Sequence, residues 1–272
     1  MTDLPSDDLD AAARDLVEEA TKPSRRVRPR LARKLADGED VQVDTPNGPV
    51  MAWRLGAGPA TLLVHGWEDD NALWSPFIDA CAELGRAVVA FDLPGHGFSP
   101  SESFSLKAAG EAVLAVAEAL GPIDSLAAHS FGCPASLYAL SHGLSVHRAV
   151  FIASPFPRTK ERESWIDDWA DRQRKRGEDP AVVERAMQMM AERQKTQAHD
   201  QVIADADLSA ITAKAMIVHS MDDGECPVGN AYALNDRLPG SQLVLVDDLG
   251  HRLVAQDAVV IERAINFVED FG

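Results

Sequence analysis

The feature that most constrains the fold of this chain is a series of short apolar runs, each followed by a helical pattern. The runs are rich in β-branched residues and apolar on both faces, which is typical of buried parallel strands. They lie at Thr61–His65, Ala87–Phe91, Leu126–His129, Ala149–Ala153, Met216–His219 and Leu243–Val246. Apolar residues at three- and four-residue intervals predict helices at 73–84, 105–120, 131–143, 228–238 and 256–270. This alternation predicts a parallel sheet covered by helices on both faces.

Two segments depart from this alternation. Near the start, 41–43 and 50–55 flank a Pro-Asn-Gly-Pro turn, which predicts a β-hairpin. Later, a long gap between two successive strands holds helical patterns at 160–176 and 181–199. We therefore expect an α/β fold with a mostly parallel eight-stranded sheet, helices on both faces, and a helical cap inserted at about 155–213.

The first forty residues differ in composition from the rest of the chain. Apolar residues at helical spacing among acidic ones predict a helix in 1–20, whereas 22–34 is strongly basic. The basic run either docks on an anionic surface, such as the protein's own acidic body, or is a solvated linker broken by two prolines. We therefore expect an N-terminal helical and basic extension over 1–40, followed by an α/β domain over 41–272.

Charge and hydropathy exclude several classes of partner. The chain carries 43 acidic and 26 basic side chains, a net charge of −17. Because such a field repels phosphate, we expect neither nucleic acid nor an anionic membrane as a partner. The chain shows no bilayer-spanning apolar run and no secretory signal, and its three cysteines are scattered. These features predict a cytoplasmic protein with reduced thiols.

A serine stands at one of the predicted strand–helix junctions, in Ala128-His129-Ser130-Phe131-Gly132. Small residues around a serine at such a corner allow a sharp turn that exposes the hydroxyl above the sheet. The usual G-x-S-x-G pattern has alanine in its first position here, and a single methyl still permits close strand–helix packing. The same pentapeptide also suits the start of an ordinary helix, so Ser130 needs partners to be a nucleophile.

A glycine follows the first of the buried strands, in Val64-His65-Gly66-Trp67. Glycine in that position lets the next backbone N–H point into a cavity. An oxyanion that develops during acyl transfer needs two such donors. We assign them to the backbone N–H groups of Trp67 and Phe131; the alternative is that Gly66 only turns the chain and Trp67 packs in the core.

Two further polar residues follow the last two strands: Asp223 comes after 216–219, and His251 after 243–246. Either residue alone suits a turn or a structural role. In an open parallel sheet, however, the carboxyl ends of the strands share one edge, where ligand sites form. We therefore expect Ser130, Asp223 and His251 to meet there as nucleophile, orienting acid and general base.

The order serine, acid, histidine, together with these loops, resembles the α/β-hydrolase superfamily, in particular its esterase-like members with a serine nucleophile. The resemblance covers about 45–272 and extends to Phe91-Asp92-Leu93-Pro94-Gly95-His96-Gly97-Phe98-Ser99, which is similar to the family's segment after its fourth strand. In many members the acid lies four residues before a proline. That spacing favours Asp223, four residues before Pro227, over Asp222.

The resemblance implies a serine hydrolase that cleaves carboxylic esters of small to medium, largely uncharged substrates through an acyl-enzyme. No nucleotide fingerprint or metal-ligand spacing is present, so we expect no cofactor and no metal. A thioesterase, a lactonase, a C–C bond hydrolase or a perhydrolase would use the same triad. Two other readings stay open: a non-catalytic α/β-hydrolase binding module, and an N-terminal arm that makes the protein a homo-oligomer.

The substrate pocket is indicated only by composition. Apolar side chains of the insertion either line an acyl pocket or pack the cap onto the body. The rest of the insertion is charged and near balance, which disfavours an interfacial lipase. An acidic cluster, Glu68-Asp69-Asp70, would repel anionic substrates if it faces the pocket. The pocket candidates are Phe156, Trp165, Trp169, Met187 and Met190, with Met189 beside them.

Overall fold

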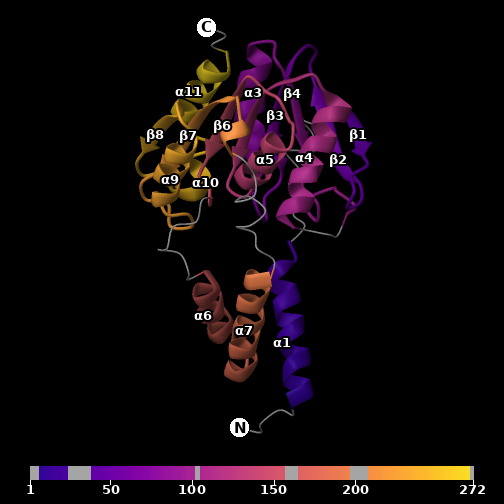
Figure 1. Cartoon of the computed structure of the whole chain (residues 1–272), viewed down its shortest axis with the longest axis vertical. Coiled ribbons are helices and arrows are strands. Elements are labelled where there is room, and N and C mark those ends of the chain that lie inside the picture. Colours follow the sequence, from indigo (N-terminus) through magenta and orange to yellow (C-terminus); the bar gives the residue numbers. More distant parts are fainter. Residues whose placement is uncertain (1–5, 24–37, 102–104, 157–164, 197–207, 270–272) are drawn as a thin grey trace. The chain divides into compact units, whose positions relative to one another are not determined.

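The computed structural model describes residues 6–23, 38–101, 105–156, 165–196 and 208–269 of the 272-residue chain. These residues form two compact units, an α/β unit and a helical unit, and Figure 1 follows the chain through both. Most of the basic run predicted at 22–34 lies outside the described residues. None of the described helices combines the length and the apolar character that crossing a membrane requires.

The α/β unit is built on one sheet of eight strands in the order β1-β2-β4-β3-β5-β6-β7-β8. β2 runs antiparallel to both of its neighbours, β1 and β4, and the remaining neighbours pair in parallel. The sheet is therefore mixed but mostly parallel, which confirms the predicted fold class. The strands are β1 (Glu39–Val43), β2 (Val50–Leu55), β3 (Ala60–Val64), β4 (Ala87–Phe91), β5 (Ile123–His129), β6 (Arg148–Ile152), β7 (Lys214–Ser220) and β8 (Gln242–Val246).

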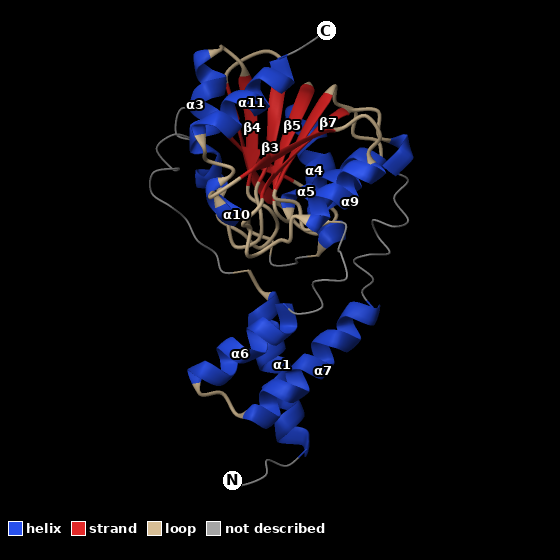
Figure 2. Cartoon of the chain, turned by 90° about the vertical axis from the view of Figure 1, so that its left-hand side faces the viewer, coloured by secondary structure: helices blue, strands red, loops and turns tan. Residues whose placement is uncertain are grey.

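Side chains of the central strands alternate between two hydrophobic cores, one on each face of the sheet. On β3, for example, Leu62 and Val64 enter one core and Leu63 the other. Because both faces are buried, these strands read as continuous apolar runs in the sequence. The first face is covered by α4 (Leu106–Leu120), α5 (Gly132–Ser141) and α9 (Gly229–Arg237), and the second by α3 (Ser75–Glu83) and α11 (Ala258–Glu269) (Figure 2). Short helical turns lie at η1 (Asn71–Trp74), η3 (Leu208–Ala210) and α10 (Gly250–Leu253).

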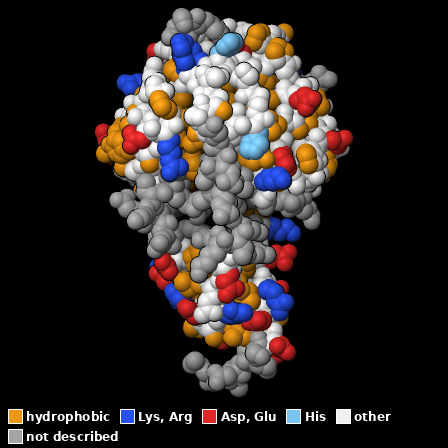
Figure 3. Space-filling model, in the orientation of Figure 1, with side chains coloured by type: hydrophobic (Ala, Val, Ile, Leu, Met, Phe, Trp, Pro, Cys, Tyr) orange, Lys and Arg blue, Asp and Glu red, His pale blue; other side chains and the backbone are white. Residues whose placement is uncertain are grey.

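The helical unit joins two parts of the chain that are far apart in sequence. It contains α1 (Ser6–Thr21), α6 (Trp165–Arg176) and α7 (Pro180–Thr196). The helix expected in the N-terminal extension, α1, packs against α7 of the predicted insertion, and the three helices share one apolar core. Arg185 of α7 donates a hydrogen bond of 2.7 Å from Nε to Asp10 of α1. Acidic and basic side chains gather together over this unit in Figure 3.

Candidate active site

Ser130 occupies the turn between β5 and α5 in a strained conformation. Its φ is +50°, in the left-handed region that residues with a side chain rarely adopt. The turn is held by two hydrogen bonds of 2.9 Å, from Ser130 N–H to the Ile152 carbonyl and from Cys133 N–H to the Ser130 carbonyl. Gly132 packs so closely on β3 that an added Cβ would lie 2.3 Å from the Val64 carbonyl oxygen. These contacts fix Ser130 at the carboxyl edge of the sheet.

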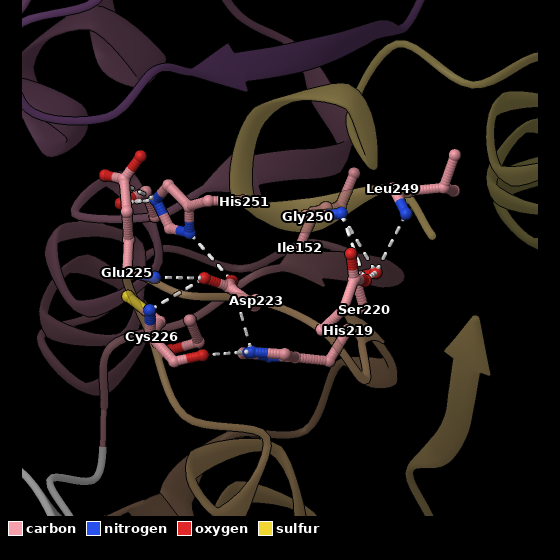
Figure 4. Close-up of polar contacts among 12 residues, drawn as sticks. Ile152, His219, Ser220, Asp223, Glu225, Cys226, Leu249, Gly250 and His251 are labelled. Carbon is pink, nitrogen blue, oxygen red and sulfur yellow. Dashed lines mark hydrogen bonds and ion pairs between the residues drawn. The ribbon is translucent and has the colours of Figure 1, made fainter. Parts of the chain in front are cut away.

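The structure brings Ser130, His251 and Asp223 together, although they belong to three separate loops. The Ser130 hydroxyl lies 2.9 Å from Nε2 of His251. Nδ1–H of His251 donates to Oδ2 of Asp223 at 2.8 Å (Figure 4). The side chains of His251 and Asp223 are buried. The arrangement is that of a nucleophile next to a base whose far nitrogen is oriented by a carboxylate.

Asp223 is held as an anion by the loop that follows β7. Its Oδ1 accepts the backbone N–H groups of Glu225 at 2.8 Å and Cys226 at 2.7 Å, and its Oδ2 lies 3.3 Å from Nε2 of His219. Burial by itself raises the pKa of Asp223, but hydrogen bonds from His219, His251 and Cys226 outweigh it and hold the pKa well below its usual range. An ionised Asp223 fixes the proton of His251 on Nδ1 and leaves Nε2 free to act as a base toward Ser130.

The neighbouring carboxylate, Asp222, has different partners. It accepts hydrogen bonds from the Ser220 hydroxyl and from the Gly250 N–H, the latter at 3.2 Å. The Ser220 hydroxyl also accepts the Gly250 N–H at 3.1 Å. Asp222 therefore braces the backbone before His251, and it is Asp223 that contacts the imidazole.

The two residues expected to supply oxyanion donors belong to the two segments next to Ser130. Phe131 follows Ser130 directly at the start of α5. Trp67 belongs to the segment after β3, and this segment approaches the serine closely: a Cβ added to Gly66 would lie 2.8 Å from the Cβ of Ser130. Only glycine permits this approach, because any larger side chain would displace Ser130 or the segment itself.

His96, from the loop after β4, holds the Trp67 segment in place. Its Nε2 accepts the backbone N–H of Glu68 at 3.0 Å, and its ring meets the Trp67 ring edge-on with centroids 5.6 Å apart. Burial lowers the pKa of His96 to about 3, so Nε2 remains an unprotonated acceptor. The sequence motif that contains His96 therefore positions the segment that carries one candidate oxyanion donor.

Two buried histidines beside the site, His129 and His219, support it through hydrogen bonds that the sequence did not predict. Nε2–H of His129 donates to the backbone carbonyl of His251 at 2.8 Å, and Nε2–H of His219 donates to the Cys226 carbonyl at 2.8 Å, close to Asp223. Burial, and then repulsion from His251, lower the pKa of His129 to about 4. The sequence does hold one indication of this role: both histidines lie at the ends of buried strands, where a polar side chain needs a hydrogen-bond partner.

A short chain of charged groups flanks the outer side of His251. The Glu225 carboxylate lies 3.9 Å from Nε2 of His251 and 3.8 Å from Nε of Arg252. Arg252 in turn donates from Nη1 to Oδ2 of the buried Asp69 at 3.3 Å. Asp69, from the predicted acidic cluster, is thus paired with Arg252, while Glu225 remains largely exposed.

Four of the five predicted pocket residues contribute to two hydrophobic cores. Phe156 is buried in the core of the α/β unit, where Arg237 lies over its ring. Trp169 and Met190 are buried in the core of the helical unit, against which Met187 and Met189 pack, and the Trp165 side chain lies outside the described part of the chain. Holding α1, α6 and α7 together is the role that the structure shows for Trp169 and Met190.

One group of side chains has the donor types of a metal site. Ligand atoms of Asp223, Cys226 and His251 lie within 4.8 Å of one another. The carboxylate and Nδ1 of this group, however, are already hydrogen-bonded to each other and to neighbouring groups. The geometry suits proton transfer at Nε2 of His251 better than metal ligation.

Comparison with known proteins defines the class of the chain. A sequence model of the alpha/beta hydrolase family matches residues 61–264, which includes Ser130, Asp223 and His251. The chain belongs to this family, as its mostly parallel sheet and the order of its loops had indicated.

Curated relatives share part of the sequence. A pimeloyl-[acyl-carrier protein] methyl ester esterase from Aeromonas hydrophila is 36% identical over 116 residues, which cover 41% of this chain and 44% of the relative. A protein of the same name from Xanthomonas campestris is 32% identical over 113 residues, 42% of this chain and 43% of the relative. The chain thus matches less than half the length of these relatives.

Solved structures share the fold at low sequence identity. An esterase from Exiguobacterium antarcticum superposes with a TM-score of 0.68 at 17% identity, covering 85% of this chain and all of that one. A Pyrococcus furiosus esterase gives a TM-score of 0.66 at 16% identity, covering 91% and 96% of the two chains. At such identities the likeness concerns the fold alone, and it confirms the α/β-hydrolase fold expected from the sequence.

Proposed function

We propose that the protein is a serine carboxylesterase that cleaves esters of small to medium, largely uncharged substrates through an acyl-enzyme. One observation carries the proposal: hydrogen bonds of 2.9 and 2.8 Å link Ser130 through His251 to the buried Asp223. The names of the curated relatives, which state action on a methyl ester, support an ester as the bond that is cleaved.

In the proposed mechanism, His251 carries a proton from Ser130 to the leaving alcohol and then accepts one from water. Serine is a weak nucleophile until a base removes its proton, and Nε2 of His251 is within hydrogen-bond distance of Oγ. As Oγ attacks the carbonyl carbon, His251 becomes an imidazolium that the Asp223 carboxylate stabilises. The imidazolium then gives its proton to the alcohol oxygen, which leaves. A water molecule, deprotonated by the same nitrogen, cleaves the acyl-enzyme and restores Ser130.

In this mechanism the backbone N–H groups of Trp67 and Phe131 stabilise the negative charge on the carbonyl oxygen. Such donors act only if they are fixed before the reaction, because reorganisation during it would cost free energy. The strained turn at Ser130, the close approach at Gly66 and the contacts of His96 with the Trp67 segment supply that rigidity. Loss of one donor lowers the rate of such enzymes by about 10²–10³.

The proposal is tested with methyl and p-nitrophenyl esters of increasing acyl length, with the wild-type protein and Ser130→Ala side by side. We expect the wild type to hydrolyse short and medium esters and Ser130→Ala to lose at least about 10³-fold in kcat/KM. Thioesters and lactones of the same acyl groups distinguish an esterase from the other hydrolases that would use this triad. Equal rates for the two proteins would overturn the proposal.

A further inference from the structure

The loop that carries Asp223 also places a second carboxylate beside the catalytic nitrogen. Asp223 accepts the backbone N–H groups of Glu225 and Cys226, so this loop wraps around its carboxylate. The Glu225 side chain then rises alongside the His251 ring (Figure 4). Its Oε2 lies 3.9 Å from Nε2, the same nitrogen that lies 2.9 Å from the Ser130 hydroxyl.

The position next to Nε2 is the place of the leaving group. In ester hydrolysis Nε2 delivers its proton to the alcohol oxygen, so this oxygen must come within hydrogen-bond distance of Nε2. The alcohol portion of the substrate therefore passes beside Glu225, whereas the carbonyl oxygen turns toward the backbone donors. Glu225 is thus placed to interact electrostatically with a charged group on the alcohol, and not with one on the acyl group.

The other charged and titratable groups around His251 are already engaged in contacts of their own. Asp223 accepts Nδ1–H, Asp222 accepts the Gly250 N–H, and His129, neutral because burial lowers its pKa to about 4, donates to the His251 carbonyl. His219 donates to the Cys226 carbonyl. Arg252 lies between the two carboxylates of Asp69 and Glu225, so one guanidinium faces two negative charges.

Glu225 differs in exposure from Asp69, the other carboxylate that Arg252 contacts. Its side chain is 55% exposed, whereas that of Asp69 is 2% exposed. Glu225 can therefore meet a substrate directly, and water and salt will weaken but not remove its field.

We propose that Glu225 sets the charge preference of the site for the alcohol half of the ester. This inference rests on the proposed esterase function. Esters of a cationic alcohol are hydrolysed with a higher kcat/KM than neutral esters of the same shape, and esters of an anionic alcohol with the lowest. The ligand feature recognised is a cationic group a few bonds from the ester oxygen.

The test uses three butyrate esters that share one acyl group. The alcohols are choline, its neutral isostere with a tert-butyl group in place of trimethylammonium, and isethionate with a sulfonate in that position. Hydrolysis is followed by proton release. For the wild type we expect kcat/KM to fall in that order, with a cation-to-anion ratio that shrinks at high salt because exposed charges are screened.

Glu225→Gln removes the charge and keeps the shape, and we expect it to lower the cation-to-anion ratio by about tenfold, in line with a unit charge acting through largely aqueous surroundings. Glu225→Lys should invert the preference, and Glu225→Asp should give an intermediate ratio. The matched control is Glu118→Gln, which removes the same charge from an exposed position on α4 and should leave the ratio as in the wild type.

A general loss of activity lowers kcat/KM for the cationic and the anionic ester alike, so it leaves their ratio unchanged. Failure of the charge preference can therefore be told apart from failure of the esterase function. If Glu225→Gln and Glu225→Lys both keep the cation-to-anion ratio within twofold of the wild type, Glu225 does not read the charge of the alcohol. If the neutral ester is hydrolysed no faster by the wild type than by Ser130→Ala, the proposed esterase function fails instead.

Discussion

His129, the residue before Ser130, holds the backbone of His251: its Nε2–H donates a hydrogen bond of 2.8 Å to the His251 carbonyl oxygen. The two rings lie close, with centroids 5.0 Å apart. The residue before the proposed nucleophile thus fixes the backbone of the proposed base. His129 is itself uncharged because burial, and then repulsion from His251, lower its pKa to about 4, so it adds no positive charge beside the imidazolium.

Loss of this contact is expected to lower kcat more than it raises KM. His129→Leu removes the hydrogen-bond donor, so the backbone of His251 and its imidazole can shift. A misplacement of this kind lowers the rate by about 10²-fold. His129→Gln retains a side-chain N–H and should recover most of the activity. Steady-state kinetics on one ester, with thermal unfolding of each variant, checks this. If the Leu and Gln variants had the same kcat, the hydrogen bond would have no part in positioning His251.

Gly66→Ala tests the close approach of the segment after β3 to the nucleophile. The added Cβ would lie 2.8 Å from the Cβ of Ser130, so either the serine or the Trp67 N–H must move. We expect a loss of about 10²–10³ in kcat, the size of one lost oxyanion donor. The control is Gly224→Ala, where an added Cβ meets open space and the residue is not in the left-handed region. Similar kinetics for the two variants would contradict this account.

The two adjacent carboxylates after β7 should behave differently when each is made neutral. Asp223→Asn removes the charge that orients His251 and should lower kcat by about 10³–10⁴, because the amide favours the wrong imidazole tautomer. Asp222→Asn weakens only the hydrogen bonds from the Ser220 hydroxyl and the Gly250 N–H and should cost less than tenfold. The comparison is made with saturating ester at one pH. Were Asp222→Asn the more damaging change, the assignment of the acid would be reversed.

The buried histidines predict a stability that declines on acidification. The pKa of His65 is lowered to about 4, that of His96 to about 3 and that of His129 to about 4, each mainly by burial. Between pH 6.5 and 4 these histidines bind protons in the unfolded chain but stay neutral in the folded chain. The free energy of unfolding therefore falls as pH falls. Each histidine contributes about 1.4 kcal/mol per pH unit in this window. Asp92, whose pKa burial raises to about 7, works in the opposite direction and offsets part of this slope.

His96→Gln isolates one of these contributions. Glutamine can accept the Glu68 N–H as His96 does, but it does not titrate. Urea unfolding at pH 6.5 and 5.0 should therefore show an average pH slope that is about 1 kcal/mol per unit smaller in the variant than in the wild type. Identical slopes would mean that His96 is not held neutral in the folded protein.

The positions of the strands along the chain, and the loops that follow them, are predictable from the sequence. Buried parallel strands leave continuous apolar runs, and every predicted strand is present with ends shifted by only a few residues. The parallel sheet then places the ends of β3, β5, β7 and β8 at one edge, which is why the sequence alone points to Gly66, Ser130, Asp223 and His251.

Contacts made through the tertiary structure could not be predicted in this way. The bond from His129 to His251 joins residues 122 positions apart, and the approach of Glu225 to Nε2 depends on how one loop wraps around Asp223. The packing of α1 against α7 likewise joins segments that lie far apart in the sequence. Periodicity shows which face of a helix is apolar, but not which partner buries it.

The central claim is that Ser130 is a nucleophile activated by His251, and a fluorophosphonate probe tests it most directly. Such a probe phosphonylates only a serine whose proton a neighbouring base can remove. The account predicts one probe per chain by intact mass, attached to the peptide that contains Ser130, with labelling abolished in Ser130→Ala and strongly slowed in His251→Ala. Unreacted wild-type protein, or labelling that persists in Ser130→Ala, would contradict it.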